Sequence, residues 1–266
     1  GILEYRGAKI QLLDMPGLIR GAARGRGRGR EVLSVARSCD LVLLMIAVFE
    51  TNVPVLAEEL SSAGIRLNAR QPAVVIKKRN RGGVNLNSTV PLTKVSVETI
   101  EAMVREFGHL NADVVIRQDI TQDELVDVLA TNRVYIPTVV VLNKIDLVGG
   151  EYLREVEKRL TSWRVVPISA ERKEGLDRLK EEIYRSLRFI RIYMKPQGKE
   201  ADLKEPLIVK QGSTVGMVCD ALHREFREKF RYANVWGKSA THPGQRAGLE
   251  HGLADEDILT IVVRRG

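Results

Sequence analysis

Residues 139–146 read Val139-Val140-Val141-Leu142-Asn143-Lys144-Ile145-Asp146, an apolar run that leads directly into an amide, a lysine and a carboxylate. A continuous apolar run is typical of a parallel strand that is covered on both faces. Ligands of parallel sheets bind where the strands end, so these polar residues stand where chemistry is expected. The stretch therefore predicts a buried strand with a binding site at its end.

The residues after the run have the chemistry to recognise guanine. The Asp146 carboxylate can accept hydrogen bonds from both the ring N–H and the exocyclic amine of guanine, whereas adenine would leave it partly unsatisfied. Asn143 can bridge the base and neighbouring loops, and the stem of Lys144 can lie along the ring face. The alternative is a plain turn that ends a strand. The position directly after an apolar strand favours the guanine site.

Other patterns predict a parallel α/β domain around this strand. Apolar runs at Leu41–Val48 and Val165–Ile168 indicate further strands, and the first of these also reads as covered on both faces. Amphipathic patterns at Glu151–Leu160 and Leu176–Phe189 indicate helices. Strands that alternate with helices argue for a parallel sheet.

The beginning of the chain predicts two short strands, Ile2–Tyr5 and Ala8–Leu13, joined by a turn at Arg6-Gly7. A Gly/Arg loop at residues 16–29 and a helix from about Arg30 to Ser38 follow.

Two more short motifs follow predicted strands. Asp14-Met15-Pro16-Gly17 has the form of the guanine-nucleotide motif in which an Asp holds Mg²⁺ through a water and a Gly amide senses the γ-phosphate. Ser169-Ala170-Glu171 places a backbone N–H, that of Ala170, where it can contact the guanine oxygen. Each motif is weak alone and is common in turns. Their order along the chain favours one nucleotide site made of Asp14, Gly17, Asn143, Lys144, Asp146, Ser169 and Ala170.

Two segments depart from the alternation of strands and helices. Residues from about 64 to 120 predict an inserted α+β lobe, with a basic strand at Ala73–Arg79, a Gly82-Gly83 turn, a helix at Val97–Phe107 and a strand at Ala112–Arg117. After about Ile190 the pattern becomes strand, strand, helix (Val215–Phe230) and short strands that end at Ile258–Val263. This second segment is long enough for a compact domain of its own.

Composition narrows the class of protein. No apolar run approaches the ~18 residues of a membrane span, and no export leader is visible. Cys39 and Cys219 are far apart in the sequence, so two buried free thiols are favoured over a disulfide. Free thiols in turn favour a cytoplasmic location. The four histidines are scattered, so we expect no structural metal site.

The chain carries a formal charge of +8, and two basic clusters stand out along it. The first is a Gly-rich loop with Arg24, Arg26, Arg28 and Arg30, and the second is Lys77-Lys78-Arg79 on the predicted lobe. Such clusters attract phosphate backbones, and without an amphipathic helix beside them they favour RNA over a membrane surface. The alternative is a merely solvated face. For Tyr232 and Trp236 we expect a core or turn role in preference to base stacking.

Several longer stretches resemble the developmentally regulated GTP-binding (DRG) proteins, a family of Obg-related GTPases. They are Ala8–Gly17, Gly25–Arg30, Val35-Ala36-Arg37, Gly64–Asn68, Gly82–Leu86, Asn132–Pro137 and Val235-Trp236-Gly237. The resemblance covers essentially the whole chain. It implies a P-loop-GTPase-like α/β domain at 1–189 with an inserted lobe at about 64–120, followed at 190–266 by a β-grasp TGS domain, which is ubiquitin-like.

The resemblance also implies a function. We expect a protein that binds GTP or GDP with Mg²⁺, is stimulated by K⁺, and acts as a GTP-hydrolysing switch in translation at the ribosome and its RNA. A family partner protein is part of this expectation, and a membrane is not.

The chain departs from the family pattern in two ways. No G-x-x-x-x-G-K motif followed by Ser or Thr occurs, and Gly237-Lys238-Ser239 is a decoy because Tyr232 stands where the first Gly belongs. Because the α- and β-phosphates would then lack a cradle, we expect an N-terminally truncated chain that is inactive by itself, from a parent that is a GTPase. The alternative is a non-enzymatic RNA-, ribosome- or protein-binding module. Leu18 also replaces the water-orienting Gln of Ras-like proteins.

Overall fold

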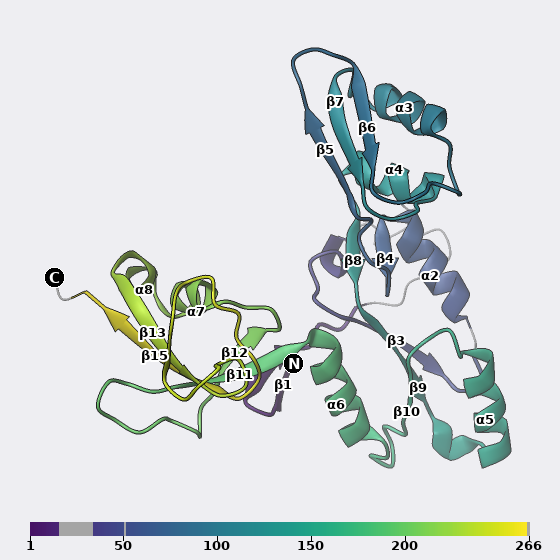
Figure 1. Cartoon of the computed structure of the whole chain (residues 1–266). Coiled ribbons are helices and arrows are strands. Elements are labelled where there is room, and N and C mark those ends of the chain that lie inside the picture. Colours follow the sequence, from purple (N-terminus) through teal and green to yellow (C-terminus); the bar gives the residue numbers. More distant parts are fainter. Residues whose placement is uncertain (16–33, 51, 265–266) are drawn as a thin grey trace. The chain divides into compact units, whose positions relative to one another are not determined.

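The structure is a computed structural model that describes residues 1–15, 34–50 and 52–264 (Figure 1). It divides into two compact units. One consists of Gly1–Met15, Lys144–Leu147 and Val166–Gly266, and the other of Pro16–Asn143 and Val148–Val165. Each unit is described by itself.

A parallel sheet with the order β10-β9-β3 carries the predicted central strand. Strand β9 (Thr138–Asn143) pairs in parallel with β3 (Val42–Ala47), from Val42 opposite Thr138 to Ala47 opposite Asn143, and β10 spans Val165–Pro167. The side chains of Val139 to Leu142 are fully buried, as an apolar run covered on both faces requires. This prediction is confirmed.

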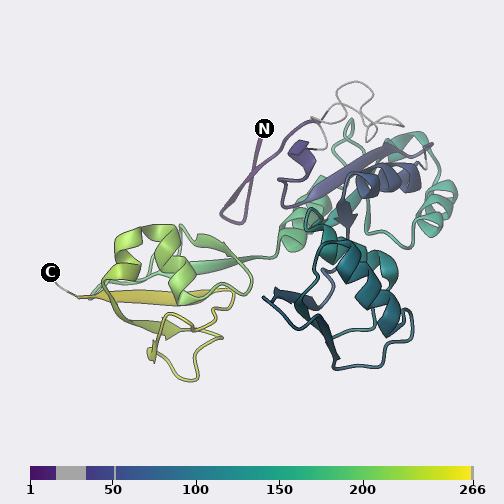
Figure 2. The ribbon, with the colours of Figure 1, turned by 90° about the horizontal axis from the view of Figure 1, so that it is seen from above.

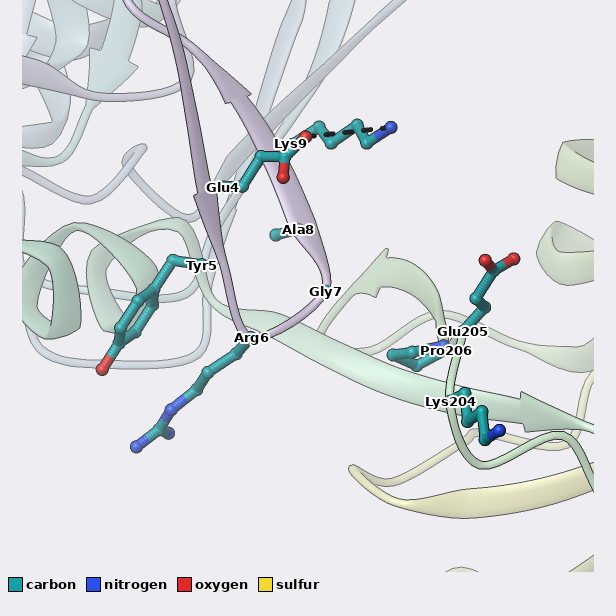
Figure 3. Close-up of a pocket in the computed structure, with 9 residues that line it drawn as sticks. All are labelled: Glu4, Tyr5, Arg6, Gly7, Ala8, Lys9, Lys204, Glu205 and Pro206. Atoms are coloured by element: carbon teal, nitrogen blue, oxygen red, sulfur yellow. Dashed lines mark ion pairs between the residues drawn. The ribbon is translucent and has the colours of Figure 1, made fainter.

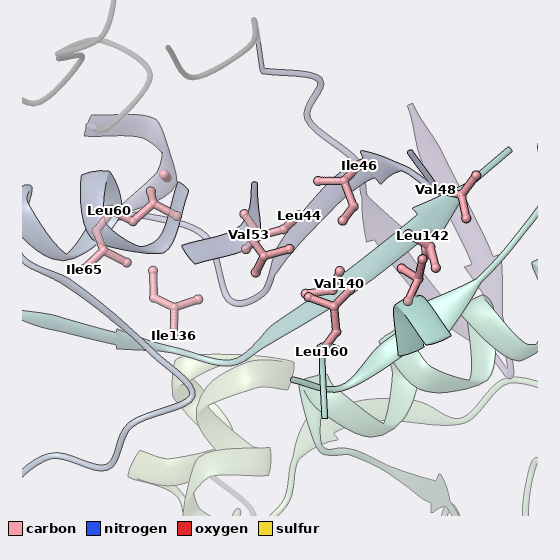
Figure 4. Close-up of a cluster of buried hydrophobic side chains, with 12 residues drawn as sticks. Leu44, Ile46, Val48, Val53, Leu60, Ile65, Ile136, Val140, Leu142 and Leu160 are labelled. Carbon is pink, nitrogen blue, oxygen red and sulfur yellow. The ribbon is translucent and has the colours of Figure 1, made fainter. Parts of the chain in front are cut away.

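Strand β3 corrects the prediction for the other apolar run. Leu44 and Ile46 are buried, but Met45 between them is 59% exposed. The buried side chains join a core with residues of α2 (Val53–Ser62), among them Leu60 (Figure 4). Val156 of α5 (Gly150–Arg159) belongs to the same core. Successive side chains of a strand point to opposite faces, so one face of β3 is more deeply buried than the other, on which Leu43 and Ala47 are half-buried.

The inserted lobe has a core of its own. Its sheet has the order β5-β7-β6, from strands β5 (Val74–Lys78), β7 (Ala112–Ile116) and β6 (Val84–Ser88), and helices α3 (Val97–Glu106) and α4 (Gln122–Ala130) pack on it. Helix α4 lies beyond residue 120 but contributes Leu125 and Leu129 to this core. A capping box of Thr121 and Glu124 starts the helix, a signal that the sequence interpretation missed.

The two ends of the lobe meet in a short parallel pair, β4 (Ile65–Leu67) with β8 (Val134–Ile136). Asp127 of α4 is only 8% exposed, and its carboxylate accepts two hydrogen bonds of 2.7 Å from the Arg66 guanidinium. Arg133 Nε lies 3.1 Å from the same carboxylate, and Arg66 Nη1 also donates to Ser61 O at 2.6 Å. This charged cluster ties the lobe helix to the strands at its base.

The C-terminal region is a mixed sheet with the order β12-β11-β15-β13-β14. Its strands are β11 (Phe189–Met194), β12 (Leu207–Lys210), β13 (Phe230–Trp236), β14 (Gln245–Ala247) and β15 (Asp257–Val263). Helices α7 (Val215–Leu222) and α8 (Arg224–Glu228) cover one face (Figure 2), and Val215, Val218 and Cys219 enter its core.

The single helix that we predict at Val215–Phe230 is wrong. His223 is extended (φ −171°, ψ 141°) and separates α7 from α8, and Phe230 already begins β13. The apolar spacing is helical across the break, so periodicity alone did not reveal it.

The N-terminal hairpin consists of β1 (Ile2–Tyr5) and β2 (Ala8–Gln11), with the predicted turn at Arg6 (φ 49°) and Gly7 (φ 82°). Its strands pair only with each other within the described residues, so they extend no parallel sheet there. Tyr5 Oη donates to Glu181 of α6 (Leu176–Leu187) at 2.8 Å. The helix predicted at about 30–38 is helical at residues 34–36, and its first residues lie outside the described part.

Candidate functional site

The site begins where β9 ends. Asn143 is the last residue of the strand, and its carbonyl accepts from Val48 N at 2.9 Å. The next residue, Lys144, has φ 66°, a left-handed conformation that only a few per cent of residues other than glycine adopt. It turns the chain out of the sheet and into a 3₁₀ turn at Ile145–Leu147, which carries Asp146.

Asp146 is held by the residues that follow β10. Ile145 N donates to Ile168 O at 3.3 Å, and the Ser169 hydroxyl donates to the Asp146 carboxylate. The same hydroxyl oxygen accepts from Arg172 N at 3.1 Å, and the Ser169 side chain is fully buried. Two sequence-predicted site residues that are far apart along the chain are therefore in direct contact.

The charge state of Asp146 follows from these contacts. The Ser169 hydrogen bond is the main cause that lowers the pKa of Asp146 below its ordinary value, and the charges of Arg172 and Lys144 act in the same direction. A hydrogen bond to the charged form of a carboxyl favours that form. Asp146 is therefore an ionised acceptor at neutral pH, as the recognition of two N–H donors requires.

The loop that carries Ser169 and Ala170 is closed tightly. Ser169 and Glu174 exchange backbone hydrogen bonds of 3.1 and 3.0 Å, and Ala170 is exposed between them. Gly175 then has φ 74°, and a Cβ there would lie 2.4 Å from Pro167 O. Only glycine fits this position, which sets the point where α6 begins.

The remaining predicted site residues are not brought to this loop by any described contact. Asp14 is exposed, with no hydrogen bond or ion pair to another described residue. It lies three residues beyond the end of β2, whereas we predict a strand that continues to Leu13. Gly17, Arg24, Arg26, Arg28 and Arg30 lie outside the described residues.

The lobe cluster is partly neutralised. Lys77 and Lys78 at the end of β5 are exposed and form no ion pair with the described residues. Arg79 differs, because its Nη1 lies 3.0 Å from Asp113 Oδ1. The three residues are therefore not equivalent as phosphate contacts.

The aromatic prediction agrees with the structure in part. Trp236 packs its indole against Gly244, which fits the predicted turn role, and both Tyr232 and Trp236 are half-buried outside the buried core clusters of the described residues. The cysteine prediction fares better. Both thiols are free; Cys219 is buried, Cys39 is half-buried, and burial raises the pKa of each.

A hollow of about 500 Å³ lies beside the β1–β2 turn, and none of the described residues that line it is a predicted site residue (Figure 3). Acidic and basic side chains both line it, and Glu4 and Lys9 are 3.9 Å apart. A Cβ at Gly7 would lie 2.8 Å from Pro206 Cγ, so the turn packs closely on that proline. Mixed charge and an open shape give this hollow no clear ligand preference.

Membrane spans and metal clusters are both missing from the part of the chain that the structure describes. Those residues contain no helix that is both long and apolar enough to cross a bilayer. They also contain no group of three or more His, Cys, Asp or Glu side chains arranged to hold a metal ion.

Three family models match consecutive parts of the chain. A model described as a 50S ribosome-binding GTPase matches residues 1–78, the C-terminal region of the same domain matches 81–189, and the TGS domain matches 190–263.

Relatives match along the whole chain. An uncharacterized GTP-binding protein of Methanocaldococcus jannaschii is 55% identical over 268 residues, covering 100% of this chain and 68% of its own length. The developmentally-regulated GTP-binding protein 1 homolog of Dictyostelium discoideum is 42% identical, covering 98% of this chain and 72% of its own length. A GTP-binding protein of Pyrococcus horikoshii, known as a crystal structure, aligns with a TM-score of 0.41 at 17% identity, over 79% of this chain and 60% of its own.

Proposed function

The chain belongs to the family of developmentally regulated GTP-binding proteins, and from this premise we propose that it recognises guanine nucleotides through Asp146. Asn143 and Lys144 flank the base, and the Ala170 amide contacts the guanine oxygen. The observation that supports this proposal is the hydrogen bond by which the buried Ser169 holds Asp146 ionised.

The wider proposal is a nucleotide switch that hydrolyses GTP in translation or another process at the ribosome. The match of residues 1–78 to a model described as a 50S ribosome-binding GTPase supports a ribosomal partner. Asp14 has the chemistry to hold Mg²⁺ through a water, since its carboxylate is exposed and engaged by no other described residue. Gly17 would sense the γ-phosphate, and K⁺ would stimulate hydrolysis.

A second candidate is a binding module without catalysis. One observation favours it for these 266 residues, which hold no phosphate-loop motif. The base contacts would then act without the phosphate cradle, and nucleotides would bind weakly. Binding of GDP to this chain with sub-micromolar affinity would contradict this second candidate.

The test of the base site is Asp146→Asn. We expect the affinity for fluorescent GDP to fall at least about tenfold, or ~1.4 kcal/mol. Xanthosine diphosphate should become the preferred competitor, because the amide donates where the carboxylate accepted and xanthine carries a carbonyl in place of the amine. Asp177→Asn is the matched control, since its side chain is 96% exposed on α6 and pairs only with Lys180 among the described residues. Unchanged base preference in the Asp146 variant would contradict the proposal.

A further inference from the structure

The turn of the β1–β2 hairpin lies directly against the C-terminal sheet. A Cβ at Gly7 would lie 2.8 Å from Pro206 Cγ and 3.7 Å from Cδ1 of Ile208 on β12 (Figure 3). The φ of Gly7 is 82°, in the left-handed region that favours glycine. The backbone of the turn therefore comes as close to the C-terminal sheet as the absence of a side chain allows.

A single carboxylate holds the same turn to α6. Glu181 accepts a hydrogen bond from Tyr5 Oη at 2.8 Å, and its Oε2 lies 2.9 Å from Arg6 Nη2. The Tyr5 hydrogen bond is the main cause that lowers the pKa of Glu181, so this carboxylate is ionised at neutral pH. Its other oxygen accepts from Arg185 Nε on α6 at 2.8 Å. Glu181 therefore ties two consecutive residues of the hairpin to one helix.

Three aromatic rings continue this contact into the C-terminal sheet. The Tyr5 ring packs edge-on against that of Tyr184 on α6, with 5.9 Å between the centroids. Tyr184 is only 6% exposed, and its ring packs in the same way, also at 5.9 Å, against Phe189 at the start of β11. The Arg6 guanidinium lies 5.5 Å and 5.8 Å from the centroids of the Tyr5 and Tyr184 rings. The hairpin, α6 and the sheet are thus joined by ring packing as well as by charge.

The other end of the hairpin leads to Asp14. Gly1 N donates to Leu12 O at 2.8 Å and Leu12 N donates to Gly1 O at 2.8 Å, so the pairing extends one residue beyond β2. Asp14 is the second residue after Leu12. A two-stranded hairpin is at best marginally stable in water by itself, and within the described residues β1 and β2 pair with no third strand. The order of the strand that precedes Asp14 therefore depends on the contacts at the turn.

From these contacts we propose that Glu181 and Pro206 are positioning residues for Asp14, which act through the hairpin and let the C-terminal sheet set the place of this carboxylate. The proposal rests on the proposed function, which assigns Asp14 to Mg²⁺, and it adds how that site is regulated. With the turn held, β2 is ordered up to Asp14; with the turn released, the hairpin loses its support.

The two states of the turn give the device its direction. A ligand that draws the segment at Pro206 away from Gly7 favours the released hairpin, and it therefore lowers the affinity of the Asp14 site for Mg²⁺ and nucleotide. Mg²⁺ with nucleotide opposes that ligand to the same extent, because coupling between two binding sites is reciprocal.

The methyl group of Met15 provides the direct measurement, since Met15 follows Asp14 in the chain. The chain has five methionines, so one methyl NMR spectrum contains four internal references, Met45, Met103, Met194 and Met217. In the full 266-residue chain, Glu181→Ala should shift the Met15 signal toward that of an unfolded chain and leave the references in place. Hydrogen exchange of the hairpin amides should accelerate about tenfold or more, the effect of one lost hydrogen bond to a charged group.

Two further variants of α6 show whether the effect is specific. Glu181→Gln keeps an oxygen that can accept from Tyr5 and Arg6, so it should lose less exchange protection than Glu181→Ala. Asp177→Ala removes a carboxylate that pairs only with Lys180 among the described residues, and it should leave the hairpin unchanged. If the contacts were merely structural, Glu181→Ala would lower the stability of the whole protein and leave the Met15 signal of the folded state in place.

Paired variants test the contact with the C-terminal sheet itself. Gly7→Ala places a methyl group against the Pro206 ring, so it should displace the turn, accelerate hairpin exchange and shift the Met15 signal. Pro206→Ala removes both ring carbons that lie within 3.3 Å of that position, and only the strain of the positive φ then remains. Adding Pro206→Ala to Gly7→Ala should therefore recover about tenfold of the lost protection. Pro243→Ala, at an exposed proline of the same domain, should recover none.

The outcomes are distinguishable. An unchanged Met15 signal in Glu181→Ala, equal effects of Glu181→Ala and Asp177→Ala, or a Gly7→Ala defect that Pro206→Ala does not relieve would each overturn the proposal. The metal role of Asp14 is measured separately, by the broadening of the Met15 signal with Mn²⁺ and GDP, which Asp14→Asn should abolish. Failure of that measurement would leave positioning through the hairpin intact, and failure of the hairpin variants would leave the metal role in place.

Discussion

Ser169 is the residue on which the state of Asp146 depends. It is fully buried, accepts from Arg172 N at 3.1 Å and donates to the Asp146 carboxylate. The carboxylate itself is close to solvent, so without this partner its pKa would lie nearer to the ordinary value for aspartate. One hydroxyl thus shapes the loop and sets the charge of the residue that we propose as the reader of the base.

We predict that Ser169→Ala raises the pKa of Asp146, as measured by carboxyl carbon NMR during a pH titration. In the native chain the pKa of Asp146 is lowered by folding. The ionised Asp146 therefore stabilises the folded state at pH values above its unfolded pKa, and this stabilisation is lost as the pH falls through the folded pKa. The variant should therefore lose less stability than the native chain on acidification. Its stability at neutral pH should fall by about 1 kcal/mol, since Arg172 N loses its acceptor. Ser162→Ala changes an exposed serine and should do neither.

Lys144 has a strained backbone conformation within the candidate guanine site. Its positive φ costs of order 1–2 kcal/mol for a residue with a Cβ. Such outliers persist where the surrounding structure holds them, and they are common at functional sites. Here the conformation separates Asn143, which still belongs to β9, from Asp146 on the following turn.

At the scale of elements, the loop between β10 and α6 depends on the absence of a side chain. Gly175 combines φ 74° with a close approach to Pro167 O and Ile168 Cα. The chain offers a control in Gly198, which has φ 71° and no other heavy atom near the position of a Cβ.

We predict that Gly175→Ala lowers the free energy of unfolding by more than about 3 kcal/mol, from backbone strain and steric overlap together. Gly198→Ala should cost only the strain, about 1–2 kcal/mol. Urea denaturation of both variants gives the comparison. Equal destabilisation would show that the loop relaxes without cost and that the tight closure beside Ser169 has no role.

The lobe depends on the charged cluster at its base. Asp127 forms ion pairs with Arg66 and Arg133, and all three side chains are largely buried. Removing one partner of a buried ion pair leaves a desolvated charge without compensation. Tyr135 beside them has a raised pKa, chiefly through burial and the charge of Asp127.

Asp127→Ala should therefore destabilise the protein by about 3 kcal/mol in urea denaturation. Asp113→Ala removes a carboxylate that is 34% exposed and pairs with Arg79, and it should cost less than about 1 kcal/mol. If the two variants were equally destabilised, the cluster at the lobe base would be no more than a surface ion pair.

At the scale of the whole molecule, we expect the two basic clusters, the Gly/Arg loop and Lys77-Lys78-Arg79, to attract RNA through their positive charge. We predict that Lys77→Gln with Lys78→Gln flattens the salt dependence of RNA binding, by up to about 0.7 in log–log slope for each single-stranded phosphate that the lysines no longer neutralise. Arg79→Gln should have a smaller effect, because Asp113 already neutralises that guanidinium. Salt titrations with labelled RNA measure both.

Replacement of four arginines with serine, at Arg24, Arg26, Arg28 and Arg30, should weaken RNA binding further. This loss of affinity should add to the loss from the Lys77 and Lys78 substitutions if the two clusters contact separate phosphates. RNA affinity and salt slope that remain unchanged with both clusters removed would show that this charge is only a solvated face.

The sequence by itself determined the central strand and the family, and it predicted the chemistry that follows the strand. The pattern of Val139–Leu142 predicted a buried strand, and that of Asn143 to Asp146 predicted a guanine site, because both signals are local. The strand β5, the helix α3 and the hairpin turn were also predicted, since apolar alternation, helical periodicity and a Gly turn act within a few residues.

Only the tertiary structure decided what depends on contacts between distant residues. It joined Ser169 to Asp146, gathered Arg66 and Arg133 around Asp127, and paired β4 with β8. It also broke the helix at His223 and left Met45 exposed. Tyr232 and Trp236 show the reason most clearly, because their half-burial depends on neighbours from β14, β15 and Lys195. No local pattern in β13 specifies those neighbours.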